Sequence, residues 1–224
     1  MKMKRLPLLA LVILVAYLST PSARARDANR SARWEKAIAA FEEKDKASPP
    51  PRHAVLFVGS SSIRFWDVAK SFPGLDVINR GFGGSELGDS VYFAPRIVLP
   101  YEPRTIVLYA GDNDLASGKT PEQVAADFRE FTRLVLAKLP RTRIVFVSIK
   151  PSPSRWKLVD KSRQTNDLIA AHCKSDERLA YVDVATAMLG ADGKPRAELF
   201  LSDNLHLNAK GYELWASLLK PHLR

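Results

Sequence analysis

The sequence predicts an α/β protein in which helices cover both faces of a central parallel sheet of about five strands. Three short apolar runs, at residues 54–58, 105–109 and 143–147, are typical of buried parallel strands. Two weaker strand candidates lie at 76–78 and 179–184. Helical patterns separate these segments, and such an alternation forms βαβ units around a parallel sheet.

An amphipathic helix is expected first, over about residues 27–46. Its apolar face consists of Trp34, Ile38 and Phe41, which recur at helical spacing. Several prolines follow, and they end the helix because proline cannot donate the next backbone hydrogen bond. We therefore predict an N-terminal helix and linker over 26–52 and a main domain over 53–224.

Three further helices are expected within the main domain. The clearest begins at Thr120, where Thr-Pro-Glu-Gln offers an N-cap, a proline at the first helical position and a capping box. Its buried stripe consists of Val124, Phe128, Phe131 and Val135. A second helix is expected over 156–174, and a last one from about Asn208. Along one side of the last helix lie Tyr212, Trp215 and Leu219.

Residues 1–25 have the layout of a secretory signal peptide. A positive start at residues 2–5 precedes an uncharged apolar run at 6–18, and Ala23 and Ala25 supply the small residues before a cleavage site. An uncleaved membrane anchor is the alternative, but the apolar run is shorter than the roughly 20 residues that span a bilayer. We expect a periplasmic or secreted protein of the bacterial cell envelope, with no stable membrane span after cleavage.

Composition excludes several classes of function. Four of the ten net positive charges lie in residues 1–25, which contain no acidic residue, so the mature chain carries +6. These charges are dispersed and form no basic stripe with interleaved aromatic residues, which argues against nucleic acid as a partner. The single cysteine, Cys173, excludes an intramolecular disulfide and a multi-cysteine zinc site.

The first two strands end in loops with possible chemistry. In α/β proteins, ligands bind beyond the carboxyl ends of the strands. Serines 60–62 follow the first strand, and a serine at a helix start could be a nucleophile or merely an N-cap. Three glycines within residues 81–84 would let the backbone approach a ligand closely or would form a flexible connector. This loop lacks the spacing and the lysine of a phosphate-binding P-loop.

Two further loops supply an amide and a histidine. Asn113 follows the third strand and could donate to a developing negative charge, although asparagine is also an ordinary turn residue. Asp203 lies three residues before His206, and in a helical turn the two side chains would project to one side. Such an aspartate orients a general base, and a helix-capping role is the alternative. Of the four histidines, only His206 has an acid at this spacing.

These motifs, in this order, resemble those of the SGNH (GDSL-type) hydrolases, in the branch that contains the platelet-activating-factor acetylhydrolase catalytic subunits and their bacterial relatives. The resemblance runs from about Ala54 to the C-terminus. By this resemblance, the catalytic residues are Ser61, Asp203 and His206, and the oxyanion hole is formed by Ser61, Gly84 and Asn113.

One departure from the family pattern is visible. The aspartate of the family's Gly-Asp-Ser motif is Ser60 here. That aspartate is not the acid of the catalytic triad, so the apparatus is retained, but Ser60, Ser61 and Ser62 all stay candidates for the nucleophile. An ungapped alignment favours Ser61.

The resemblance implies a flavodoxin-like three-layer α/β/α sandwich and a serine esterase that hydrolyses short-chain acyl esters, with acetyl esters as the expected substrates. It implies neither a metal nor an organic cofactor, and a substrate that is a small-molecule, lipid or glycan ester. Two alternatives keep the fold: a cell-envelope glycan O-acetyltransferase or O-acetylesterase, and a non-catalytic envelope-binding module. A flavodoxin-like nucleotide binder would explain the glycine loop but has no use for Asp203 and His206.

Four aromatic residues could either line an acyl pocket or belong to the core. They are Trp66, Phe82, Tyr92 and Phe93. Aromatic side chains of a sheet protein usually pack inside, which favours the core.

Overall fold

The computed structural model describes residues 31–223. The predicted signal peptide at 1–25, and the start of the first predicted helix, lie outside the described residues. Within 31–223, no helix combines the length and the apolar character that a membrane span requires.

A five-stranded parallel sheet forms the centre of the molecule, which confirms the predicted fold class. Its strands lie in the order β2-β1-β3-β4-β5. Their bounds are β1 Val55–Gly59, β2 Val77–Gly81, β3 Thr105–Tyr109, β4 Arg143–Val147 and β5 Leu179–Val182. Gly59 at the end of β1 pairs with Gly81 of β2 on one side and with Tyr109 of β3 on the other. The carboxyl ends of these three strands therefore meet at one edge of the sheet.

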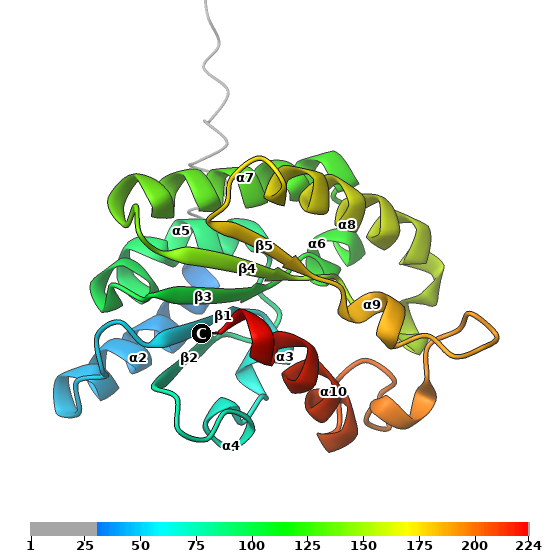
Figure 1. Ribbon diagram of the computed structural model, residues 1–224, viewed down its shortest axis with the longest axis horizontal. Helices are drawn as coiled ribbons and strands as arrows, with labels where there is room; N and C mark the ends of the chain where they lie inside the picture. The colour runs from blue at the N-terminus through cyan, green and yellow to red at the C-terminus, as the bar shows by residue number, and fades with distance from the viewer. Residues whose placement is uncertain (1–30, 224) are drawn as a thin grey trace, which may run out of the picture.

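Two helical layers cover the sheet (Figure 1). One layer contains α2 (Glu35–Ala47), α5 (Leu87–Ile97), α7 (Pro121–Lys138) and α8 (Val159–Cys173). The other contains α3 (Ser61–Arg64), α4 (Val68–Ser71), α9 (Val184–Ala187) and α10 (Ala209–Leu219). Strand alternation divides the core accordingly: in β1, Leu56 and Val58 face the first layer, and Val55 and Phe57 face the second.

The expected helices are present within residues 31–223, and one of them starts differently from the prediction. The capping box of α7 forms as predicted, and all four residues of its apolar stripe are fully buried. Asn208 caps α10 by accepting a hydrogen bond from the N–H of Gly211. The helix expected over 156–174 divides into a 3₁₀ segment, η3 (Pro153–Leu158), and α8.

The sequence-based expectations misplaced the end of one strand and omitted one helix. The second strand was expected to end at Ile78, but β2 continues through Asn79 and Arg80 to Gly81. These polar side chains are satisfied within the fold: Asn79 Nδ2 donates to the carbonyls of Ile63 and Trp66. Sequence analysis also missed α5, whose helical pattern is interrupted by a glycine and a proline.

The residues before β1 pack against the rest of the described fold. A 3₁₀ turn, η1 (Ala32–Trp34), leads into α2. The buried guanidinium of Arg80 on β2 forms an ion pair with Asp45 of α2 and donates to the hydroxyl of Tyr101, 2.8 Å away. Trp34 lies edge-on to Phe82 with ring centroids 5.9 Å apart. The segment before β1 therefore reaches the edge of the sheet where the candidate site lies.

Candidate active site

A tight turn after β1 presents the candidate nucleophile. Gly59 has φ of +136°, and a Cβ added there would lie 1.8 Å from the carbonyl oxygen of Tyr109. Only glycine fits this position, because the adjoining strand backbone occupies the space of a side chain. The chain turns here into the short helix α3, whose first residue is Ser61.

The structure distinguishes the three neighbouring serines. Ser60 and Ser62 are buried, and their hydroxyls make no hydrogen bond within residues 31–223. Ser61 is partly exposed, and its Oγ lies 3.0 Å from Nε2 of His206. Of the three hydroxyls, that of Ser61 is in contact with a candidate base.

His206 connects this serine to Asp203. Its Nδ1 lies 2.5 Å from Oδ2 of Asp203. The other carboxylate oxygen, Oδ1, accepts the backbone N–H groups of Leu205 and His206, each at 2.9 Å. The hydrogen bonds from the ring and backbone of His206, and from the backbone of Leu205, lower the pKa of Asp203 to about 2. The carboxylate is therefore ionised throughout the physiological pH range.

Asp203 and His206 are not in a helical turn, as their spacing had suggested. They lie in a loop between Phe200 and Leu207, which form an isolated antiparallel bridge. The residue that caps α10 is Asn208, so Asp203 has no capping role. The two side chains meet because Asp203 binds the backbone of the loop through one oxygen and turns the other toward the imidazole.

An apolar rim adjoins the imidazole. The ring of Phe65 is exposed and lies edge-on to that of His206, with centroids 5.1 Å apart. Leu201 is also exposed, and its N–H donates to the carbonyl of His206. The Phe65 ring beside the imidazole, together with Leu201 on the loop that carries His206, offers apolar surface to the uncharged part of a ligand.

The glycine loop lies beside Ser61. A Cβ added at Gly83 would lie 3.8 Å from the Cβ of Ser61. The next residue, Gly84, has φ of +76°, and the ring of Trp34 lies 3.2 Å from where its Cβ would be. The loop backbone is therefore close to the serine, with the aromatic ring of the N-terminal segment behind it.

Asn113 lies in α6 (Asp112–Ala116), directly after β3 and its following turn. Its Nδ2 donates to the carbonyl of Ser85, 2.9 Å away, which ties it to the end of the glycine loop. Its Oδ1 accepts from Nη2 of Arg155 at 2.9 Å. The structure thus joins Ser61, His206 and Asp203 by hydrogen bonds, and it ties Asn113 to the carbonyl of Ser85, the residue after Gly84.

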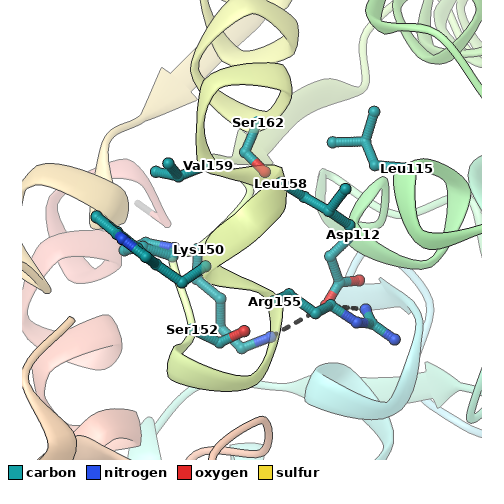
Figure 2. A pocket seen from close by; sticks show the side chains of 10 residues that line it. Asp112, Leu115, Lys150, Ser152, Arg155, Leu158, Val159 and Ser162 are labelled. Atoms are coloured by element: carbon teal, nitrogen blue, oxygen red, sulfur yellow. Dashed lines mark hydrogen bonds and ion pairs between the residues drawn. The ribbon is translucent and has the colours of Figure 1, made fainter. Parts of the chain in front are cut away.

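A buried charged cluster next to Asn113 was missed by sequence analysis (Figure 2). Lys150, whose side chain is 1% exposed, lies 3.1 Å from Oδ2 of Asp112, and Nη1 of Arg155 lies 3.0 Å from the same oxygen. Burial alone would raise the pKa of Asp112, but the two cations hold it below its usual value. A lysine three residues after the apolar run of β4 was the available signal.

Three of the four aromatic residues considered for an acyl pocket belong to the core. Trp66, Phe82 and Phe93 are buried in the core, whereas Tyr92 on α5 is 42% exposed. Among residues 31–223, no cluster of three or more histidine, cysteine or acidic side chains is arranged to hold a metal ion.

The chain is similar to known proteins in both sequence and fold. The sequence model of the GDSL-like Lipase/Acylhydrolase family matches residues 58–214. The human (Homo sapiens) platelet-activating factor acetylhydrolase IB subunit alpha1 is 25% identical over 193 residues, which cover 84% of this chain and 81% of the relative.

Solved structures with the same fold include a GDSL-like lipase from Bacteroides thetaiotaomicron, with a TM-score of 0.71 and 20% identity. The likeness covers 83% of this chain and 96% of that chain. A catalytic mutant of Axe2, an acetylxylan esterase from Geobacillus stearothermophilus, has a TM-score of 0.64 and 14% identity. That likeness covers 78% of this chain and 95% of the other.

Proposed function

This chain belongs to the GDSL-like lipase/acylhydrolase family of ester-hydrolysing enzymes, and we propose that it is a serine esterase that cleaves short acyl esters, acetyl esters first. One observation carries the proposal: Oγ of Ser61 lies 3.0 Å from Nε2 of His206, whose Nδ1 contacts the carboxylate of Asp203. A serine hydroxyl, an imidazole and a carboxylate in this order form the apparatus of nucleophilic acyl transfer.

The proposed reaction has two steps. Ser61 Oγ attacks the ester carbonyl while His206 Nε2 takes its proton, and the leaving alcohol departs with that proton as the carbon–oxygen bond breaks. Water then attacks the acyl-enzyme, again giving a proton to His206, and the carboxylic acid leaves as Ser61 regains its hydrogen. Asp203 keeps the proton of the neutral imidazole on Nδ1, so that Nε2 is free to accept.

The negative charge of the tetrahedral intermediate requires donors close to Ser61. We assign this role to the backbone N–H groups of Ser61 and Gly84 and to Nδ2 of Asn113. Support comes from the closeness of the glycine loop to Ser61 and from the bond between Asn113 and the Ser85 carbonyl. Loss of one such donor lowers kcat by about 10²–10³-fold in serine hydrolases.

The acetyl preference is supported by two relatives of different origin. The names of both the human relative and the Axe2 structure specify cleavage of an acetyl group. The rim formed by Phe65 and Leu201 would contact the uncharged part of such a substrate. We further propose that the signal peptide directs the enzyme to the cell envelope, which purification of the mature protein and its N-terminal sequence would test.

Hydrolysis of p-nitrophenyl acetate tests the proposed function. Ser61→Ala is expected to abolish turnover and covalent labelling by a fluorophosphonate probe. Ser62→Ala, a matched change of a buried neighbour, is expected to keep both. If the wild-type protein neither hydrolyses the ester nor labels, the protein is a binding module on this fold.

A glycan acceptor in place of water would make the enzyme an O-acetyltransferase with the same residues. The acetylxylan esterase among the structural neighbours makes carbohydrate esters a reasonable second substrate class. Partitioning of the acetyl group between water and an added oligosaccharide distinguishes the two. Transfer exceeding hydrolysis would favour the transferase.

A further inference from the structure

We propose that Arg155 is a positioning residue that sets the orientation of the Asn113 amide, so that its Nδ2 faces the oxyanion. The inference rests on the proposed esterase function, in which Asn113 supplies one oxyanion donor. It concerns a residue outside the family motifs, carried by η3 on the far side of Asn113 from the glycine loop.

The hydrogen bonds of Asn113 permit one amide orientation. Arg155 Nη2 is 2.9 Å from Oδ1, and a guanidinium has only donors, so the amide oxygen must face it. The carbonyl of Ser85 only accepts, so the amide nitrogen must face the glycine loop, 2.9 Å away. If the amide were rotated by 180°, its NH₂ group would face the guanidinium, which has only donors, and its oxygen would face the carbonyl oxygen of Ser85. One Nδ2 hydrogen binds Ser85, and the second remains for the oxyanion.

Arg155 is itself held in place by the buried charges in Figure 2. Its Nη1 lies 3.0 Å from Oδ2 of Asp112, and Lys150 Nζ lies 3.1 Å from the same oxygen. Lys150 also donates to the hydroxyl of Tyr109, 3.0 Å away. The Asp112 side chain is only 9% exposed, so its attraction for the guanidinium is screened less by water than that of a surface ion pair.

The charges around Asp112 distinguish a positioning role of Arg155 from a purely stabilising one. Asp112 already has Lys150 as a buried partner, so a second cation is not needed to neutralise its carboxylate. Two cations against one carboxylate leave a surplus positive charge beside Asn113. A charged donor on Oδ1 polarises the amide and strengthens Nδ2 as a donor to negative charge. Arg155 would therefore act on the transition state through Asn113 rather than on substrate binding.

A double-mutant cycle on p-nitrophenyl acetate hydrolysis tests the inference. Arg155→Met is expected to lower kcat about 10- to 100-fold with KM little changed, since a misplaced donor has effects of this size. In the Asn113→Ala background, the same change is expected to lower kcat less than about twofold, because the group through which it acts is gone. Arg155→Lys keeps the charge without the planar fork and should recover only part of kcat.

Lys157→Ala serves as a matched control, because this exposed residue lies in the same segment and should keep full activity. Melting temperatures of all variants separate folding from catalysis, and Arg155→Lys carries the test if Arg155→Met does not fold. Equal losses of kcat in both backgrounds, or a lower melting temperature with unchanged kcat, would overturn the inference. An inactive wild-type enzyme would instead refute the esterase function itself.

Discussion

Replacing Asp203 by asparagine should invert the hydrogen bonding of the catalytic histidine while leaving the loop intact. In the wild type, Oδ1 accepts two backbone N–H groups at 2.9 Å, and Oδ2 faces Nδ1 of His206. The substituted side chain would keep its amide oxygen on the backbone donors and turn its NH₂ toward Nδ1. The imidazole must then accept at Nδ1 and carry its proton on Nε2, which faces the Ser61 hydroxyl 3.0 Å away.

The expected loss follows from this tautomer. An Nε2 that already bears a proton cannot accept one from Ser61, and such a change lowers kcat by about 10⁴-fold, or about 5.5 kcal/mol of transition-state free energy. KM should change little, because neither group binds the ground-state ester. The pKa of Asp203 is about 2, so protonation of this carboxylate should not reduce wild-type activity above about pH 4.

The assay is steady-state hydrolysis of p-nitrophenyl acetate, with melting temperature as the folding check. Asp192→Asn is a matched control, since Asp192 also accepts a backbone N–H in an exposed turn, and within residues 31–223 it has no hydrogen bond or ion pair with a histidine. It should retain wild-type kcat. If Asp203→Asn kept more than about a tenth of wild-type kcat while folded, the assignment of Asp203 as the orienting acid would be refuted.

Three further predictions concern stability and the glycine loop. Burial raises the pKa of Asp114 to about 6, so ionisation of this carboxyl destabilises the folded protein. As the pH rises from about 4 to about 7, the free energy of unfolding of the wild type, measured in urea, should fall by about 2–3 kcal/mol relative to that of Asp114→Asn. A pH-independent difference would contradict this. Asp45→Ala leaves the buried Arg80 guanidinium without its carboxylate and should lower the free energy of unfolding by about 3 kcal/mol, where an unchanged value would show that the pair is dispensable. Gly84→Ala adds a side chain at φ of +76° against a tryptophan ring, and should lose about 1–2 kcal/mol and at least tenfold in kcat. Gly193→Ala has a similar φ but open space around its Cβ, so it should lose stability alone.

The parts of the fold that sequence predicts well are those fixed by local patterns. The runs that became β3 and β4 were placed to the residue, because buried parallel strands are continuously apolar. The helix starting at Thr120 was placed equally well, because its capping box and proline act within one turn. The second strand was misplaced at its end because Asn79 and Arg80 look like loop residues until their partners in the fold are known.

In the candidate site, too, the residues that local patterns mark could be predicted, and those that depend on tertiary contacts could not. Ser61, Asn113 and the glycine loop lie at strand ends, where βα topology brings them to one edge, so their motifs could be found from the chain alone. Arg155 carries no local signal, because its role depends on Asn113, which is distant in sequence and near only in the folded chain. Sequence patterns find residues whose spacing forms a local motif, such as Asp203 and His206, and they miss a partner such as Arg155 that has no motif of its own.

The distance between base and nucleophile depends on the last helix rather than on the sheet. Ser61 follows β1, but His206 comes after the last strand, so strand order does not bring them together. Contacts of α10 do so. The hydroxyl of Tyr212 donates to the carbonyl of Ser62, 3.0 Å away, and its ring stacks on Trp66 with centroids 5.3 Å apart. The loop that carries His206 leads directly into this helix. Docking of α10 onto the turn after β1 therefore sets the 3.0 Å contact on which the proposed chemistry depends.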